Sequence, residues 1–247
     1  MAMTETPEPV WPARRQPPSG LQDHCYREAR AIDEWIVAAD LGQSTDPTAI
    51  AALHHRVIPQ AEWSPIVHTG TYPASTAWVQ KRIEYFDVRH LERLPLGMPY
   101  PAQVDHIRGL LQRPPLDKAI FIIDETGVGR PVGDIFNAGG LRPWRITITA
   151  GNEVTKHGGK SYHVPKGVLI SSVDARLNTG ELRFAAELRE AGTLADELKD
   201  FRRKVSDAGR ATWAARAGAH DDLVLAVAMA TWFPSVRPVS DSRVLRI

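Results

Sequence analysis

Cysteine is almost absent from the sequence, with Cys25 alone among 247 residues. A single thiol excludes an internal disulfide and a cysteine-rich zinc site, and it fits a reducing compartment. The sequence also has no run of about 18 consecutive apolar residues, the length that a membrane-spanning helix needs. Its first residues lack the apolar core of a signal peptide. We therefore expect an intracellular protein with no membrane partner.

An excess of charge of one sign is lacking too. The 30 basic and 29 acidic side chains leave a formal net charge of +1. A protein with so little net charge has no global field to attract a nucleic acid, which excludes the polybasic class of binders. Any DNA contact must therefore come from a local basic patch.

Residues 130–166 are the best local patch, because six basic residues there face only two acidic ones. The six are Arg130, Arg142, Arg145, Lys156, Lys160 and Lys166. The glycine-rich loop 151–161 is predicted to follow a DNA backbone, where phosphate contacts position a duplex without reading its sequence. A solvated hairpin tip is the alternative. We select Arg130, Lys156, Lys160 and Lys166 as DNA-binding candidates, although Lys166 would also suit a solvated helix start.

Composition divides the chain into three parts. Residues 1–22 hold five prolines and no apolar period, so they cannot bury enough surface to offset their ordering entropy. We predict a flexible leader over 1–22, one domain over 23–234 and a loose tail over 235–247. A single main domain also suits the chain length.

Apolar periodicity predicts the elements of this domain. Strands are expected over 35–40, 48–57, 119–124 and 144–149. Helices are expected over 23–33, 100–111, 130–137, 166–177, 194–201 and 220–233. The segment 48–57 is rich in alanine and would also suit a helix. Strands that alternate with helices indicate an α/β fold.

Aspartates stand at the edges of three apolar elements: Asp40 and Asp124 each end a strand, and Asp221 with Asp222 opens the last helix. If the two strands are parallel neighbours, their carboxyl ends bring the acids to one sheet edge. Clustered carboxylates repel one another unless a cation neutralises them, and oxygen ligands favour Mg²⁺ or Mn²⁺. Two such ions can cleave a phosphodiester. The alternative is that each acid is only a turn former or a helix cap.

Two neighbours of these acids have open roles. Glu125 follows Asp124 and is predicted to point away from the metals, because successive strand side chains alternate between faces. His220 precedes Asp221 and suits either a proton relay or a structural contact.

Several motifs together resemble the nuclease domain of phage terminase large subunits. They are I-I-D-E-T-G-V-G-R-P-V at 122–132, R-I-T-I-T-A-G at 145–151, H-V-P-K at 163–166 and H-D-D-L-V-L-A-V-A-M-A at 220–230. The resemblance covers about 35–233. It implies a ribonuclease H-like fold, with a central mixed β-sheet flanked by helices, and cleavage of double-stranded DNA with two divalent cations. It places the catalytic acids at Asp40, Asp124 and Asp221, with Asp222 as a further metal ligand.

The resemblance also implies partners and a location: double-stranded DNA, a separate packaging ATPase, a small terminase subunit or a portal, in the cytoplasm of a bacterial host. However, the ATPase loop G-x-x-x-x-G-K-[ST] is missing from these 247 residues, so packaging activity does not follow. Two alternatives stay open. One is another enzyme of this fold, such as a Holliday-junction resolvase or a transposase-like strand transferase, and the other is a non-catalytic DNA-binding prophage module.

Overall fold

The computed structural model describes residues 26–42, 46–68, 75–127, 130–200, 202–205, 211–214 and 220–237. The chain divides into two compact units. Unit 1 is Met1–Asp33, His55–Tyr85 and Pro238–Ile247, and unit 2 is Glu34–His54 and Phe86–Arg237. The predicted leader at 1–22 lies outside the described residues, and so do residues 238–247, so the domain limits of the prediction stay predictions.

Four parallel strands form the centre of unit 2. They are β2 (Ile32–Asp40), β5 (Ile120–Asp124), β6 (Trp144–Thr149) and β8 (Ser161–Pro165). The short strand β7 (Thr155–Lys156) pairs antiparallel with β8, so the sheet is mixed. All five residues of β5 are buried, because a parallel strand in the middle of a sheet is covered on both faces. The predicted strands at 35–40, 119–124 and 144–149 are confirmed.

Two much longer strands continue the sheet, β3 (Ala49–His68) and β4 (Ser75–Arg93). The sheet order is β1-β4-β3-β2-β5-β6-β8-β7, with β9 (Leu182–Phe184) beside β4. The strand predicted over 48–57 is confirmed, but it extends past Pro59 and Pro65. The helix predicted over 23–33 is wrong, because β1 (Tyr26–Arg27) pairs with residues 78–79 and β2 already begins at Ile32.

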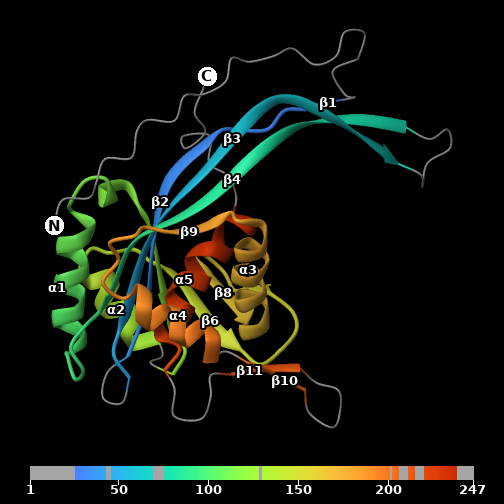
Figure 1. Ribbon diagram of the computed structural model, residues 1–247. Coiled ribbons are helices and arrows are strands. Elements are labelled where there is room, and N and C mark those ends of the chain that lie inside the picture. Colours follow the sequence, from blue (N-terminus) through green and yellow to red (C-terminus); the bar gives the residue numbers. More distant parts are fainter. Residues whose placement is uncertain are drawn as a thin grey trace. The chain divides into compact units, whose positions relative to one another are not determined.

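Helices cover both faces of the sheet in unit 2 (Figure 1). They are α1 (Tyr100–Leu111), α2 (Arg130–Ala138), α3 (Lys166–Thr179), α4 (Ala191–Asp200) and α5 (Asp222–Trp232). The described residues also form two 3₁₀ turns, η2 (Leu116–Lys118) and η3 (Phe233–Ser235). A separate hairpin consists of β10 (Arg202–Val205) and β11 (Ala211–Ala214). The five predicted helices after residue 99 are thus confirmed within a few residues, except that Phe201 lies outside the described residues.

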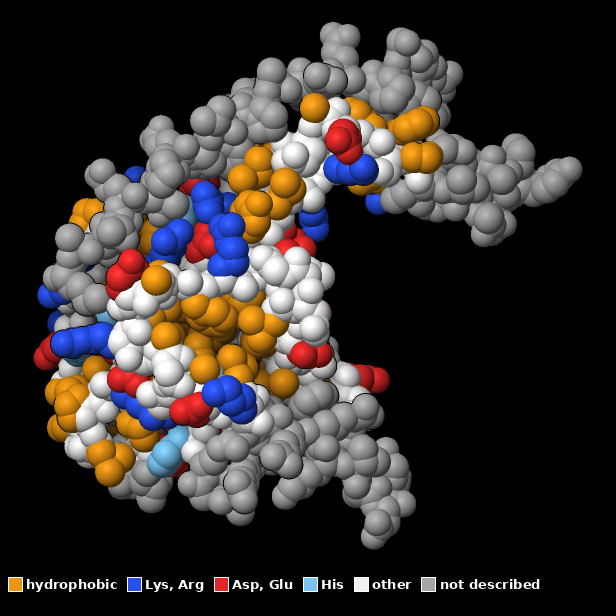
Figure 2. Space-filling view, viewed as in Figure 1, with side chains coloured by type: hydrophobic (Ala, Val, Ile, Leu, Met, Phe, Trp, Pro, Cys, Tyr) orange, Lys and Arg blue, Asp and Glu red, His pale blue; other side chains and the backbone are white. Residues whose placement is uncertain are grey.

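The last helix, α5, is the core of unit 2. All eleven of its residues are buried, as the nearly continuous apolar sequence predicts. It packs with α3 and with the inner residues of β2, β5 and β6. In the space-filling view, hydrophobic side chains gather over α5 between α3 and α4 (Figure 2). In the part of the chain that the structure describes, each helix is too short or too polar to cross a membrane.

The chain stays packed in residues 235–237, directly after α5, whereas the rest of the predicted tail lies outside the described residues. Arg237 is only 8% exposed, and its guanidinium forms an ion pair with the buried Glu34 of β2. This pair ties the end of unit 2 to the strand that carries Asp40.

Replacement of Arg237 by alanine is expected to lower the free energy of unfolding by about 3 kcal/mol, because it breaks the buried ion pair with Glu34 and removes one partner of that carboxylate. Urea unfolding followed by circular dichroism measures the effect. The double variant Glu34→Gln with Arg237→Met removes both charges and is expected to recover most of the loss. Equal losses in the single and double variants would contradict this account of the pair.

Candidate active site

Asp40 and Asp124 lie side by side at the carboxyl ends of β2 and β5. Ala39 pairs with Ile123 in the parallel register, so the next residues along the two strands are the two aspartates. Neighbouring strands lie about 4.8 Å apart, and the buried residues behind each acid hold the strands in place. The structure therefore brings together the two acids that the sequence placed at one sheet edge.

The D-E-T-G turn after β5 orients Asp124. The Thr126 N–H donates to Oδ1 of Asp124 at 2.7 Å, and the Thr126 hydroxyl accepts from the Ile148 N–H of β6 at 2.6 Å. Gly127 has a φ of +77°, a conformation that L side chains rarely adopt. The turn thus fixes the carboxylate through one of its oxygens and links it to the neighbouring strand.

The turn after Asp40 is held by a buried glutamine of α1. Gln103 donates to the Gly42 carbonyl at 3.0 Å and accepts from the Thr48 hydroxyl at 2.9 Å. A Cβ on Gly42 would lie 2.1 Å from the Asp46 carbonyl oxygen, so only glycine fits there. Sequence reasoning missed Gln103, which is 61 positions from Gly42 and carries no local signal.

The third acid, Asp221, stands directly before α5 but does not cap that helix with its side chain. Instead its Oδ2 accepts from the Lys166 ammonium at 2.6 Å. Lys166 is the first residue of α3 and follows β8 at the same end of the parallel strands as Asp40 and Asp124. This geometry departs from the alternative in which Asp221 is only a helix cap.

Arg93 holds the fourth acid, Asp222. Its Nε donates to Oδ2 at 2.7 Å and its Nη2 donates to Oδ1 at 2.9 Å, a bidentate pair that engages both oxygens of a carboxylate only 4% exposed. The same guanidinium contacts Glu197 of α4. The sequence pattern made Asp222 a candidate metal ligand, but the structure gives it a cation partner from the chain itself. Sequence reasoning did not identify Arg93 or Glu197.

Proton affinities in this cluster are raised. Burial raises the pKa of Asp40 well above its ordinary value, and the negative charges of Asp124, Asp222 and Asp221 add to the effect, while Lys166 opposes it. Burial raises the pKa of Asp124 to about 6 and that of Glu197 to about 7. Buried carboxylates that raise one another's pKa are typical of a site that needs a cation.

A divalent cation fits this donor set by its chemistry. The candidate ligands are carboxylate oxygens, which suit Mg²⁺ or Mn²⁺. Within the described ranges, no three His, Cys, Asp or Glu side chains are already arranged to hold an ion. Lys166 supplies the counter-charge at Asp221 in this arrangement, and a bound cation would take over part of that role.

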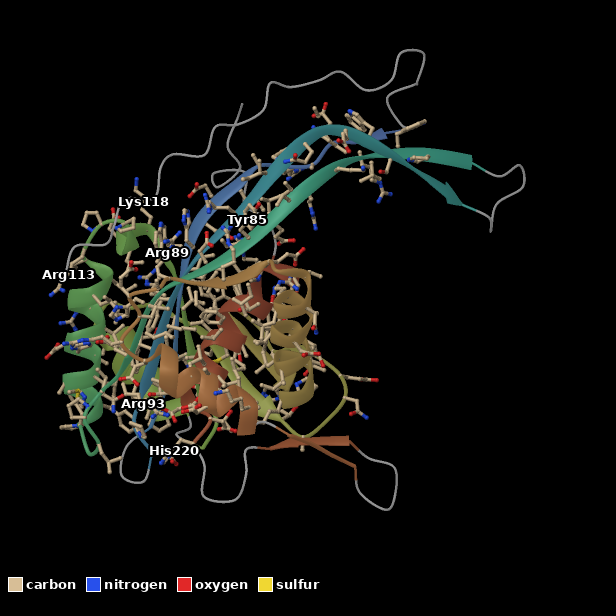
Figure 3. The ribbon with its side chains drawn as sticks, viewed as in Figure 1. Tyr85, Arg89, Arg93, Arg113, Lys118 and His220 are labelled. Atoms are coloured by element: carbon tan, nitrogen blue, oxygen red, sulfur yellow. The ribbon has the colours of Figure 1, made fainter. Side chains whose placement is uncertain are left out.

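The two neighbouring residues with open roles each have a side-chain partner outside the four acids. Glu125 accepts from Arg145 at 3.3 Å, in keeping with its predicted orientation away from the site. His220 forms a hydrogen bond with Asp46 of the loop between β2 and β3 at 3.0 Å. Figure 3 shows His220 and Arg93 at the same end of unit 2.

The DNA-binding candidates do not form one patch. Lys166 belongs to the acidic site, whereas Lys156 and Lys160 belong to the β7–β8 hairpin. The whole of β8 separates Lys160 from Lys166, about 20 Å at the rise of an extended strand. Lys156 lies over the ring of Tyr162, at 5.8 Å, and Lys160 over that of Trp144, at 5.6 Å. Arg130 begins α2, and its side chain lies outside the described residues.

The sequence matches no protein-family model and no curated protein. Solved structures are similar to it in fold. A crystal structure of the large terminase nuclease from thermophilic phage G20c matches with a TM-score of 0.50 at 19% identity, over 80% of this chain and 81% of the other. The magnesium-bound form gives 0.51 at 21% identity, over 83% of each chain. The cobalt-bound form gives 0.51 at 21%, over 81% and 80%.

The mixed sheet, its flanking helices and these matches agree with the fold expected from the motifs. The chain therefore has the ribonuclease H-like fold of a phage large terminase nuclease.

Proposed function

We propose that this protein is a metal-dependent endonuclease that hydrolyses phosphodiester bonds of double-stranded DNA. The observation that carries the proposal is the adjacency of Asp40 and Asp124 at the ends of two parallel strands, with Asp221 at the start of α5. Crowded carboxylates, here with Asp124 buried, are an arrangement that costs stability unless a cation is bound. The similarity in fold to nucleases with bound magnesium or cobalt supports the same conclusion.

In this proposal Asp40, Asp124 and Asp221 hold two divalent cations, Mg²⁺ or Mn²⁺. Bound ions of this kind supply a water nucleophile at neutral pH and stabilise the charge on the leaving oxygen. The chain itself contributes orientation: the Thr126 turn fixes Asp124, and the Gln103 clamp holds the turn after Asp40. Lys166 places a positive charge beside Asp221, where a phosphate of the substrate would lie.

DNA also needs contacts away from the acids. The hairpin lysines Lys156 and Lys160 are exposed and are assigned to the phosphate backbone, as is Arg130. The role proposed for the protein as a whole is that of the nuclease in phage DNA packaging, in the cytoplasm of a bacterial host. Its proposed partners there are a separate packaging ATPase, a small terminase subunit or a portal.

The test is cleavage of supercoiled plasmid by purified protein in Mg²⁺, Mn²⁺ or EDTA. We expect nicked and linear products with either ion and none in EDTA. Asp124→Asn is expected to abolish cleavage, because it keeps the shape of the side chain and removes its charge.

Glu125→Gln is the matched control, since it neutralises the adjacent acid, which faces Arg145 instead. It is expected to retain most of the activity. A four-way junction and an RNA–DNA hybrid, offered beside the linear duplex, separate the alternatives: strong preference for the junction would indicate a resolvase. Folded protein that binds DNA but cleaves none of these with either ion would indicate a non-catalytic DNA-binding module.

A further inference from the structure

The first turn of α5 is not capped by the side chain of the residue that precedes it. The first turn of any helix presents N–H groups without partners inside the helix, and an aspartate directly before the helix normally accepts one of them. Asp221 occupies that position, yet its side chain makes no capping bond and its Oδ2 binds Lys166 at 2.6 Å.

A residue from another helix supplies the missing acceptor. Oε2 of Glu197, in α4, accepts from the Val224 N–H in the first turn of α5 at 3.0 Å. Glu197 is only 6% exposed, so water does not compete effectively for this bond. The cap of α5 therefore comes from a side chain 27 positions earlier in the sequence.

The other oxygen of Glu197 is linked to the same helix through Arg93. Oε1 contacts the Arg93 guanidinium, which also binds both oxygens of Asp222, the first residue of α5. One carboxylate and one guanidinium thus connect β4, α4 and the start of α5. The orientation of the residues just before and at the start of α5 is set from outside the helix.

We propose that Glu197 is a positioning residue of the cation site: it caps α5 in place of Asp221 and so leaves the Asp221 carboxylate available to Lys166 and to a bound cation. This inference rests on the proposed function, because the site that Glu197 positions is the cation site of that nuclease. Without Glu197, Asp221 at the N-cap position is the expected acceptor for the Val224 N–H of α5. It would turn toward the helix, and the affinity for divalent cations would fall.

The experiment measures Mn²⁺ binding to the full chain by titration calorimetry, with the melting temperature recorded for each variant. Glu197→Ala removes the acceptor and is expected to weaken Mn²⁺ binding about tenfold, the effect typical of losing a residue that orients a ligand. The Mn²⁺ concentration for half-maximal cleavage should rise in parallel, with a smaller change in the rate at saturating Mn²⁺.

Two further variants sharpen the test. Glu197→Gln fills the same space but offers one oxygen to two donors, Arg93 and Val224, and is expected to weaken binding by about threefold. If Glu197→Ala does not fold, the Mn²⁺ affinity of Glu197→Gln tests the proposal. Asp196→Ala is the matched control on α4, because Asp196 is exposed and pairs only locally with Lys199 in the contacts described. It is expected to bind Mn²⁺ like the wild type.

Folded Glu197 variants that melt earlier but bind Mn²⁺ as tightly as the wild type would overturn the proposal, since Glu197 would then only stabilise the fold. Wild-type protein that binds no Mn²⁺ would overturn it as well. If the wild type binds Mn²⁺, the variants bind it more weakly and no DNA is cleaved, the positioning role stands and the proposed nuclease activity fails.

Discussion

Exchange of Asp221 for asparagine is expected to slow metal-dependent cleavage by about a thousandfold, equivalent to about 4 kcal/mol of transition-state stabilisation. The amide keeps the size of the side chain but loses the charge that the cations need, and it also removes the negative charge that pairs with Lys166. Single-turnover cleavage of a short duplex at saturating Mn²⁺ measures the effect.

The adjacent acid is the informative comparison. Asp222→Asn is expected to slow cleavage only about tenfold, because Arg93 already engages both of its oxygens. It should instead lower the free energy of unfolding by about 1–3 kcal/mol, since the amide is uncharged and places an NH₂ donor where one of the two acceptor oxygens faces Arg93. If Asp222→Asn loses as much activity as Asp221→Asn while keeping its stability, the roles assigned to the two acids are reversed.

Much of the fold could be predicted from local patterns in the amino-acid sequence. The predicted bounds of α1 and of β6 agree with the observed ones, because each element has a clear apolar period and a proline or polar boundary. The burial of α5 followed from its almost continuous apolar sequence. Parallel pairing of the strands at Asp40 and Asp124 was an assumption that the structure confirms.

The full length of β3 could not be predicted from the sequence, and β4 was not predicted at all. The predicted strand at 48–57 ends before Pro59, and prolines normally mark the edge or the end of a strand because they cannot donate a hydrogen bond. In the structure β3 continues through both prolines to His68. Pairing with distant residues decides such cases, as it does for β1, which a helical pattern predicted wrongly.

The residues that support the acids of the site could not be predicted either, because their partners are also distant in the sequence. Arg93 meets Asp222 across 129 positions, and Gln103 meets Gly42 across 61. A buried arginine or glutamine has no spacing that marks it in a single sequence, whereas an aspartate at the end of an apolar strand does. The ligands were therefore predictable, but the residues that orient them were not.

The metal-free protein is expected to lose stability as the pH rises from about 4 to about 7. The pKa of Asp124 is about 6 in the folded protein against an ordinary value of 3.8, so the folded state holds this proton more tightly than the unfolded chain. That stabilisation is fully present below the ordinary value and is lost as the pH rises through about 6. Asp40 shifts in the same direction. The loss attributable to Asp124 is on the order of 3 kcal/mol.

A bound divalent cation reverses this loss, because it binds the deprotonated carboxylates and only the folded state assembles them. Mn²⁺ is therefore expected to raise the melting temperature strongly at pH about 8 and little at pH about 5, compared with EDTA. Asp124→Asn removes the titrating group, so in EDTA its melting temperature should depend less on pH, and Mn²⁺ should raise it less. An equal effect of Mn²⁺ at both pH values would show that the cation does not depend on the deprotonated Asp124. An unchanged pH dependence in Asp124→Asn would show that another group titrates.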